Sequence, residues 1–336
     1  MDAPNRFVYL LNRSFQNEAT DAERAELSLL IDSGEYDAEL NAYALRSLAI
    51  RAYKDENVII SGAKSLKLQW QPYKNGILKA QLDLCEAPDI LEESKLFNIE
   101  VTTAPATDSL LAWSPDFKGY NVVIQNTNNI HNKTLRWPRR IEEKLEQYVA
   151  DGGGLYILHS ANNAFPHWKE YDRMIGLGWR LKETGFALEI DRSKKIIRIP
   201  PGEGSNTSHG ERFDALINIL SRHPINNDFP EQWRTASMEL YTHARGPAEN
   251  VTVLSYAFDI ATNKNWPVDW VVEYGKGRVY NSSMGHLWKG ENYPISYRCI
   301  GFQTTMIRAV EWLATGNVTY PLPAKFPHAS ISVLDE

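Results

Sequence analysis

The sequence predicts an α/β protein in which helices cover both faces of a parallel sheet. Between residues 57 and 158, short β-branched runs alternate with helical patterns in the order strand, helix, strand, strand, helix, strand. This alternation is typical of parallel sheets, because two parallel strands need a long crossover connection that is usually a helix. A second observation is the periodic apolar pattern of residues 299–316, which predicts a closing helix that ends at Gly316.

The first half of the chain supplies the predicted parallel strands. β-Branched or apolar runs predict strands at 57–62, 97–105, 120–126 and 155–158. A helical pattern covers 77–91. A second helix is predicted from Trp137-Pro138 to Gly152, because proline favours the start of a helix and glycine its end.

The second half of the chain is richer in predicted strands. Residues 186–202 have the pattern of a hairpin that leaves the sheet, and 212–220 fit a short helix or a strand. Three further strands are predicted within 251–259 and 268–286. The last two of these are joined by Gly275-Lys276-Gly277, which is typical of a hairpin turn.

Residues 1–56 are predicted to form a small helical appendage. Apolar residues recur there at helical spacing, and Thr20 with Glu23 three positions later is a capping-box signal. Gly34 is the expected end of that helix, and a further helix is expected near 38–53. The appendage carries no recognisable chemistry, so a contact with a partner or within a homo-oligomer is its expected role.

The composition is that of a soluble globular protein and excludes several functions. The 336 residues carry a net charge of −6 and no basic run interleaved with aromatics, which argues against nucleic-acid binding. The two cysteines, Cys85 and Cys299, have neither disulfide nor metal-site spacing. We see no export signal and no membrane-spanning run, so we expect a cytoplasmic protein that makes no membrane contact. The 10 tryptophans and 16 tyrosines permit carbohydrate binding without proving it.

Polar side chains gather in four loops that follow predicted strands or contain glycine. In open α/β sheets, ligands bind beyond the carboxyl ends of the strands. Candidate site residues therefore come from these loops: His159, Ser160, Asn162 and Asn163; Ser208 and His209; Glu239, Tyr241, His243 and Arg245; and His286. A carboxylate among histidines and a tyrosine can have its pKa adjusted for proton transfer.

Three kinds of site fit the sequence poorly. Ser160 lacks the glycines of a nucleophile elbow, because Leu158 and Asn162 occupy those positions. The glycines of 152–154 precede a strand and no Lys-Ser/Thr follows, so no phosphate loop is predicted. Imidazole and carboxylate suit Zn or Mn, but the histidines lie far apart in the sequence. No metal site and no cofactor is therefore predicted, although the donor types would accept a divalent cation.

These residues resemble the ThuA-like, or trehalose-utilisation, family. The matching segments are 120–126, 137–180, 208–210, 223–225, 239–254, 273–286 and 301–327, in the family's order. The block HSANNAFP (159–166) and the run ATGNVTYPLPAKFP (314–327) carry the resemblance most specifically. It implies a domain over about 57–327 with a tail at 328–336. The implied fold is that of class I glutamine amidotransferases, a flavodoxin-like three-layer sandwich, here with a β-rich excursion.

The resemblance implies carbohydrate metabolism and not amidotransferase chemistry. The loop that holds the catalytic cysteine of an amidotransferase carries His159-Ser160-Ala161 here. The family's polar positions fall on the residues already found: His159, Asn162, Asn163, His209, Glu239, Tyr241, Arg245 and His286. Relatives often have acids where this sequence has Asn162 and Met238, which weakens any mechanism that needs paired carboxylates.

The leading hypothesis is an enzyme that cleaves a glucoside or disaccharide, or its 3-keto form, with acid–base assistance. Glu239 or His159 is the expected base, and His286 or His209 the expected acid or enolate stabiliser. Asn162, Asn163, Tyr241 and Arg245 are the expected hydroxyl-binding residues. The alternative is a non-catalytic amidotransferase-like module that binds sugar or builds an assembly, since fold does not fix function. An enzyme should bring His159, His209, Glu239 and His286 together, with at least one perturbed pKa.

Overall fold

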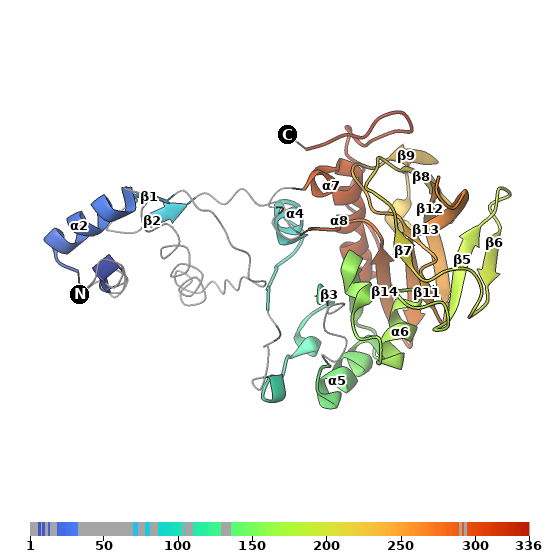
Figure 1. Ribbon diagram of the computed structural model, residues 1–336, viewed down its shortest axis with the longest axis horizontal. Coiled ribbons are helices and arrows are strands. Elements are labelled where there is room, and N and C mark those ends of the chain that lie inside the picture. The colour runs from blue at the N-terminus through green and yellow to red at the C-terminus, as the bar shows by residue number, and fades with distance from the viewer. Residues whose placement is uncertain are drawn as a thin grey trace. The chain divides into compact units, whose positions relative to one another are not determined.

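The computed structural model describes two compact parts of the chain (Figure 1). The described residues are 6–7, 9–10, 13, 19–32, 70–72, 78–80, 87–102, 104, 110–128, 136–288, 291 and 294–335. The smaller unit comprises 1–84, 98–104 and 289–292, and the larger unit comprises the remaining residues. All predicted site residues belong to the larger unit.

The larger unit is built on one ten-stranded mixed sheet. Its main path runs β3 (Val122–Gln125), β4 (Gly154–Leu158), β14 (Gly277–Ser282), β13 (Lys264–Tyr274), β12 (Val251–Asp259), β8 (Leu216–Ile219) and β9 (Gln232–Arg234). Off this path, β5 (Phe186–Ile190) pairs with β13, β6 (Ile196–Ile199) and β11 (Arg245–Gly246). A separate small sheet joins β7 (Ser208–His209) to β10 (Tyr241–Thr242).

The expectation of a parallel sheet is correct for only part of this sheet. The β3–β4 and β4–β14 pairs are parallel, whereas the other strand pairs are antiparallel. The reason lies in the connections, because β12, β13 and β14 follow one another through tight turns that permit only antiparallel pairing. The predicted turn joins β13 to β14 at Gly275, whose φ of +61° suits glycine. The predicted hairpin at 186–202 is confirmed as β5–β6.

Helices cover opposite faces of the parallel strands. They are α4 (Ala87–Glu93), α5 (Arg139–Ala150), α6 (Lys169–Ile175), α7 (Ile295–Arg298) and α8 (Ile300–Thr315), with 3₁₀ turns at Phe117–Gly119, His159–Asn163 and Pro224–Asn226. A Cβ on Gly154 would lie 2.8 Å from the Leu313 carbonyl of α8, and one on Gly277 would lie 2.0 Å from the Val149 carbonyl of α5. Gly154 pairs with Arg278, so Gly277 points to the other face.

Several sequence predictions are confirmed at the level of single elements. The helix after Pro138 is α5, and the apolar run before His159 is β4. The closing helix α8 ends at Gly316, whose φ is +79°. In the smaller unit, α2 (Asp21–Asp32) begins with the predicted capping box: Glu23 N–H donates to Thr20 Oγ1, and Thr20 N–H donates to the Glu23 carboxylate.

Other predictions are wrong or concern residues outside the described parts. Residues 97–102 form no strand, since no described strand pairs with them. The helical pattern over 77–91 corresponds to a short strand, β2 (Leu78–Ala80), paired with β1 (Trp70–Pro72), followed later by α4. The expected strand at 57–62, the helix at 38–53, Gly34, Cys85 and the boundary at residue 56 lie outside the described residues.

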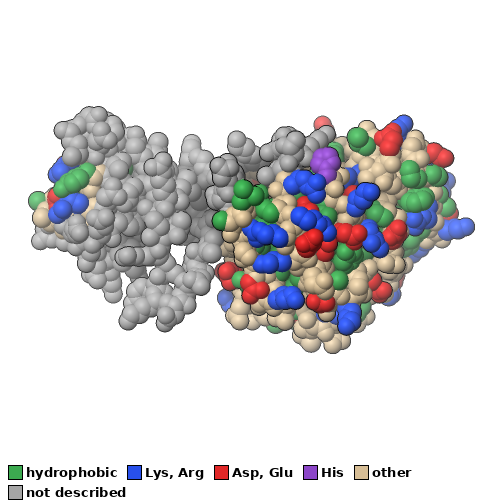
Figure 2. Space-filling model, turned by 90° about the horizontal axis from the view of Figure 1, so that it is seen from below, with side chains coloured by type: hydrophobic (Ala, Val, Ile, Leu, Met, Phe, Trp, Pro, Cys, Tyr) green, Lys and Arg blue, Asp and Glu red, His purple; other side chains and the backbone are tan. Residues whose placement is uncertain are grey.

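The surface and the helices give two further observations. On the face shown in Figure 2, basic and acidic side chains are interspersed over the described atoms. Ion pairs of α5 show the same mixing, with Arg139 3.0 Å from Glu143 and 2.6 Å from Glu146.

None of the helices among the described residues is long and apolar enough to cross a membrane.

Candidate active site

Four segments that are far apart in the sequence meet beyond the ends of β4 and β14. His159 follows β4 directly and begins a 3₁₀ turn, with a φ of +33°. His286 lies four residues after the end of β14. The β7–β10 pair sets His209 opposite Tyr241, and Glu239 comes two residues before Tyr241. The chain therefore gathers the predicted acid–base residues into one cluster.

His159 is a buried, neutral imidazole with a fixed tautomer. Its Nδ1 lies 2.7 Å from the Ser283 carbonyl oxygen, and its Nε2 lies 2.8 Å from the Tyr241 hydroxyl. A carbonyl oxygen only accepts, so Nδ1 carries the hydrogen and Nε2 accepts from Tyr241. Burial, reinforced by the charge of His286, lowers the pKa of His159 to about 3 despite the nearby Glu239. The ring is therefore neutral at physiological pH.

Glu239 is a buried carboxylate on which several donors converge. Its Oε1 accepts from Arg212 Nε at 3.1 Å and from Trp288 Nε1 at 2.6 Å. Its Oε2 is hydrogen-bonded to His286 Nδ1 and lies 3.6 Å from His209 Nε2. Burial by itself would raise the pKa of Glu239, but the hydrogen bond and charge of His286 outweigh it and lower that pKa to about 2. Glu239 is therefore ionised.

Aromatic rings enclose this carboxylate. His159 stacks on His286 with ring centroids 4.5 Å apart and planes within 15°. Trp179 packs edge-on against Tyr241 at 5.1 Å and lies 5.5 Å from the ring of His209. Burial and the Glu239 charge raise the pKa of Tyr241, so its hydroxyl remains a hydrogen-bond donor.

The accessibility of the site residues divides them into two groups. The side chains of His159 and Glu239 are 2% exposed, whereas those of His209 and His286 are 24% and 17% exposed. Trp288 is half exposed while its indole N–H holds Glu239. A substrate arriving from solvent therefore meets His209, His286 and Trp288 before it meets the two buried groups.

Asn162 and Asn163 lie next to the cluster in the same 3₁₀ turn as His159. Asn162 is fully buried, and neither of its side-chain polar atoms has a hydrogen-bond partner among the described residues. Asn163 Oδ1 is also buried without a hydrogen-bond partner among the described residues. Arg180 holds the backbone on either side of Asn163, because its Nη1 donates to the Asn162 carbonyl at 3.0 Å and its Nη2 to the Ala164 carbonyl at 2.7 Å. Their predicted role in binding hydroxyls remains a prediction.

Arg245 makes no described hydrogen bond to the cluster. It is fully buried, and its guanidinium donates to main-chain carbonyls at Gly185, Pro200, Glu203 and Ser205. These contacts tie a glycine-containing loop to β11. They favour a structural role over the predicted binding of a sugar hydroxyl.

Three residues of the cluster, Arg212, Trp288 and Trp179, were missed by the sequence-based prediction. Arg212 follows His209 by three positions and Trp288 follows His286 by two. Closeness to a candidate histidine was therefore the available signal for these two. Trp179 comes from the loop after α6, and only its ring contacts reveal it.

The same cluster contains the described side chains best placed to hold a cation. The potential ligand atoms of His159, Glu239 and His286 all lie within 4.8 Å of one another. These three residues lie far apart along the chain, and for that reason the sequence predicts no metal site. In the folded chain the three side chains lie next to one another.

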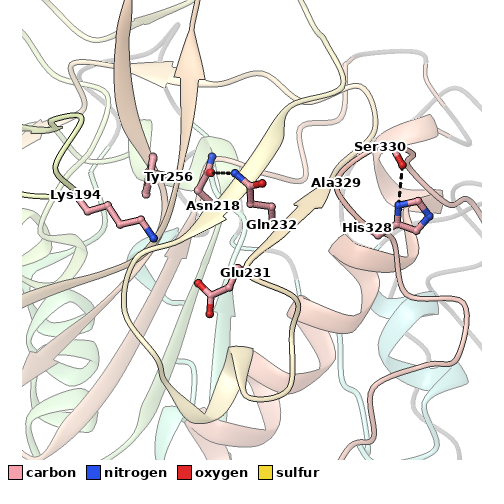
Figure 3. A pocket seen from close by; sticks show the side chains of 8 residues that line it. All are labelled: Lys194, Asn218, Glu231, Gln232, Tyr256, His328, Ala329 and Ser330. Atoms are coloured by element: carbon pink, nitrogen blue, oxygen red, sulfur yellow. Dashed lines mark hydrogen bonds between the residues drawn. The ribbon is translucent and has the colours of Figure 1, made fainter.

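An open cavity of about 630 Å³ lies elsewhere, at β8, β9, β12 and the C-terminal segment (Figure 3). It is lined by Lys194, Asn218, Glu231, Gln232, Tyr256, His328, Ala329 and Ser330. None of these is a predicted site residue. We place the candidate site at the histidine cluster, because imidazoles surround a buried carboxylate there, whereas Glu231 of the cavity is exposed and paired with Arg222.

Comparison with known proteins identifies the family. The ThuA family model, described as trehalose utilisation, matches residues 76–313, which is more than half of the chain. The chain belongs to the ThuA family. In this ThuA chain, the matched region contains every residue of the cluster.

The chain is also similar to solved structures of ThuA-like proteins. The ThuA chain is similar to a crystal structure of a ThuA-like protein of Parabacteroides merdae, with 29% identity and a TM-score of 0.69 over 74% of this chain and 90% of that one. A ThuA-like protein of Bacteroides uniformis matches at 17% identity and a TM-score of 0.43, over 69% of this chain and 85% of that one. No curated protein matches the sequence.

The structure also bears on amidotransferase chemistry in this ThuA chain. His159 stands directly after β4, where the resemblance predicts that an amidotransferase would hold its cysteine. Cys299 is buried between α7 and α8, and burial raises the pKa of its thiol. That thiol is therefore poorly suited to act as a nucleophile.

Proposed function

We propose that the protein is a carbohydrate-processing enzyme that cleaves a glucoside or disaccharide, or its 3-keto form, with acid–base assistance. One observation carries the proposal: Glu239 is a buried carboxylate whose Oε2 is approached by three imidazoles, those of His159, His209 and His286. Such a carboxylate–histidine pair is a common device for moving protons, since the carboxylate orients the ring and stabilises its protonated form.

The accessible histidines are the groups that we assign to proton transfer. The hydrogen bond from His286 Nδ1 to Glu239 leaves Nε2 of the neutral ring as its basic nitrogen. We therefore assign His286 as the base and Glu239 as the group that orients it. The sequence led us to expect Glu239 or His159 as the base and His286 or His209 as the acid or enolate stabiliser. His209 is the corresponding acid or enolate stabiliser. His159 and Tyr241 form the buried support of this pair.

A 3-keto sugar suits these groups. The ketone acidifies the neighbouring C–H, so a base of moderate strength can remove that proton. The electron pair then expels the glycosidic oxygen, which leaves with a proton from the acid. This reaction forms a double bond in the sugar ring and needs no strong nucleophile. The half-exposed indole of Trp288 offers an apolar face for a sugar ring.

The test is turnover of native and 3-keto disaccharides with product detection, with and without chelator. We expect Glu239→Gln and His159→Ala to reduce turnover at least about 100-fold. Glu231→Gln is the matched control, because Glu231 is an exposed carboxylate paired with Arg222. Unchanged turnover in both site variants would refute the assignment of this cluster as the active site. Sugar binding without turnover by the unaltered chain would favour the non-catalytic module.

The remaining expectations belong to the same proposal. The parallel strands β3, β4 and β14 would correspond to the flavodoxin-like core of the amidotransferase-like fold. We also propose a small-molecule sugar as the partner, no nucleic-acid or membrane partner, a cytoplasmic location and a homo-oligomer.

A further inference from the structure

Two histidines of the site share a feature of metal-binding histidines. Nδ1 of His159 lies 2.7 Å from the Ser283 carbonyl oxygen, and Nδ1 of His209 lies 2.7 Å from the Gly210 carbonyl oxygen. A carbonyl oxygen only accepts, so both Nδ1 atoms carry hydrogen, and Nε2 is the nitrogen that can offer a lone pair. Histidines that bind metals are commonly held in this way by a carbonyl or carboxylate on their other nitrogen.

The lone pairs of these rings face another electron-rich atom. Oε2 of Glu239 lies 3.8 Å from His159 Nε2 and 3.6 Å from His209 Nε2, beyond hydrogen-bond range in both cases. A carboxylate oxygen accepts hydrogen bonds, so Oε2 is also an acceptor. The Tyr241 hydroxyl donates to His159 Nε2, and His286 Nδ1 is hydrogen-bonded to Glu239 Oε2. Such a convergence of acceptors is the electrostatic setting in which a cation binds.

The two oxygens of Glu239 are used differently. Oε1 accepts from Arg212 Nε and Trp288 Nε1, which fixes the plane of the carboxylate. Oε2 is directed at the histidines. Outer hydrogen bonds that orient a ligating carboxylate in this way are a regular part of metal sites.

We propose that His159 Nε2, Glu239 Oε2 and His286 Nδ1 bind one divalent first-row transition-metal ion. Their ligand atoms all lie within 4.8 Å of one another, and the 3.8 Å between His159 and Glu239 fits two ligands of one ion at bonds of about 2.0–2.2 Å. Binding requires the other neutral tautomer of His286, with its hydrogen on Nε2, so His286 does not serve as the base while the ion is bound, and the Tyr241 hydroxyl leaves His159 Nε2. His209 lies outside this group and stays available for proton transfer.

The donor set decides the class of ion. Two imidazoles and one carboxylate suit Zn²⁺, Mn²⁺, Fe²⁺ or Co²⁺, whereas Mg²⁺ and Ca²⁺ prefer oxygen ligands. Three protein ligands leave at least one position of the ion for water or substrate. The cation would sit in the site of the proposed function, but its binding is measured directly and does not depend on turnover.

The experiment uses the full chain without a polyhistidine tag, treated with EDTA and desalted. Zn²⁺ and Mn²⁺ are titrated by calorimetry, and Co²⁺ by visible absorption, which reports the ligands around the ion. We expect one equivalent to bind. His159→Ala and Glu239→Gln should bind at least about tenfold more weakly. His328→Ala is the matched control and should bind as the unaltered chain does, because His328 is an exposed histidine bonded to Ser330.

Two results would overturn the proposal. One is the lack of stoichiometric uptake of all three ions by the folded, unaltered chain, a measurement that needs no variant to fold. The other is equal uptake by both site variants and the unaltered chain, which would locate the ion elsewhere. Metal binding without sugar turnover would leave the metal site standing and refute the proposed function. Turnover by the metal-free chain, together with the lack of metal uptake, would refute the metal site and leave the proposed function standing.

Discussion

Arg245 tests whether a predicted sugar-binding residue instead holds the fold together. Its guanidinium donates to four carbonyls: Nε and Nη2 reach Ser205 at 3.1 and 2.9 Å, Nη1 reaches Gly185 and Pro200 at 3.3 Å each, and Nη2 reaches Glu203. Lysine carries all its donors on one atom and cannot span this set. Arg245→Lys therefore leaves two or three of these carbonyls without their donor.

The expected loss of stability follows from these contacts. A hydrogen bond from a charged donor contributes roughly 1.5–3 kcal/mol. Residues 201–206 are exposed, so water replaces part of the lost contacts. We expect Arg245→Lys to lower the free energy of unfolding by about 3 kcal/mol. Arg222→Lys is the control and should cost less than about 1 kcal/mol, because Arg222 is half exposed and pairs with Glu231 at the surface.

Urea unfolding followed by circular dichroism measures both variants, and calorimetry measures their sugar binding. If Arg245→Lys keeps the stability of the unaltered chain but loses sugar binding, the structural argument is refuted. The original prediction of a hydroxyl-binding arginine would then be correct.

Three other predictions follow from single contacts. Burial raises the pKa of Asp269 to about 6, although hydrogen bonds from Ser255 and Tyr280 act to lower it. Between about pH 4 and 6 the native state therefore binds more protons than the unfolded state. Stability should fall by up to about 3 kcal/mol as pH rises through that window, and urea unfolding of Asp269→Asn should lack this slope. Gly277→Ala would place a Cβ 2.0 Å from the Val149 carbonyl and should cost about 3 kcal/mol, visible as a lower melting temperature; an unchanged melting temperature would contradict the close packing of α5. Trp288→Phe removes the 2.6 Å hydrogen bond to Glu239. It should lower kcat/KM about tenfold with little change in the melting temperature. An unaltered kcat/KM would show that this bond does not position the carboxylate.

The fold and the core of the site were predictable from different signals. The helix α5 and the strand β4 followed from proline, glycine and apolar periodicity, which act locally. Candidate residues such as His159 and Glu239 were visible because polar groups that follow apolar strands are conspicuous in a sequence.

What the sequence could not supply is the pairing between distant segments. Residues 97–102 alternate between exposed and half-buried positions as a strand would, but they have no described strand beside them. A strand is defined by its neighbour, and local pattern contains no information on that neighbour. The role of Arg245 was hidden for the same reason, because its acceptors lie 40 to 60 residues away.

The mixed sheet has a consequence for the order in which the molecule can assemble. The hairpins β12–β13 and β13–β14 join neighbouring segments and can form early, since closing a short loop costs little entropy. The β4–β14 pairing is different, because it brings His159 to the Ser283 carbonyl across 124 residues of chain. The hydrogen bond that fixes the His159 tautomer therefore cannot exist before this long-range closure. A partly folded chain could hold most of its antiparallel strands and still have no active site.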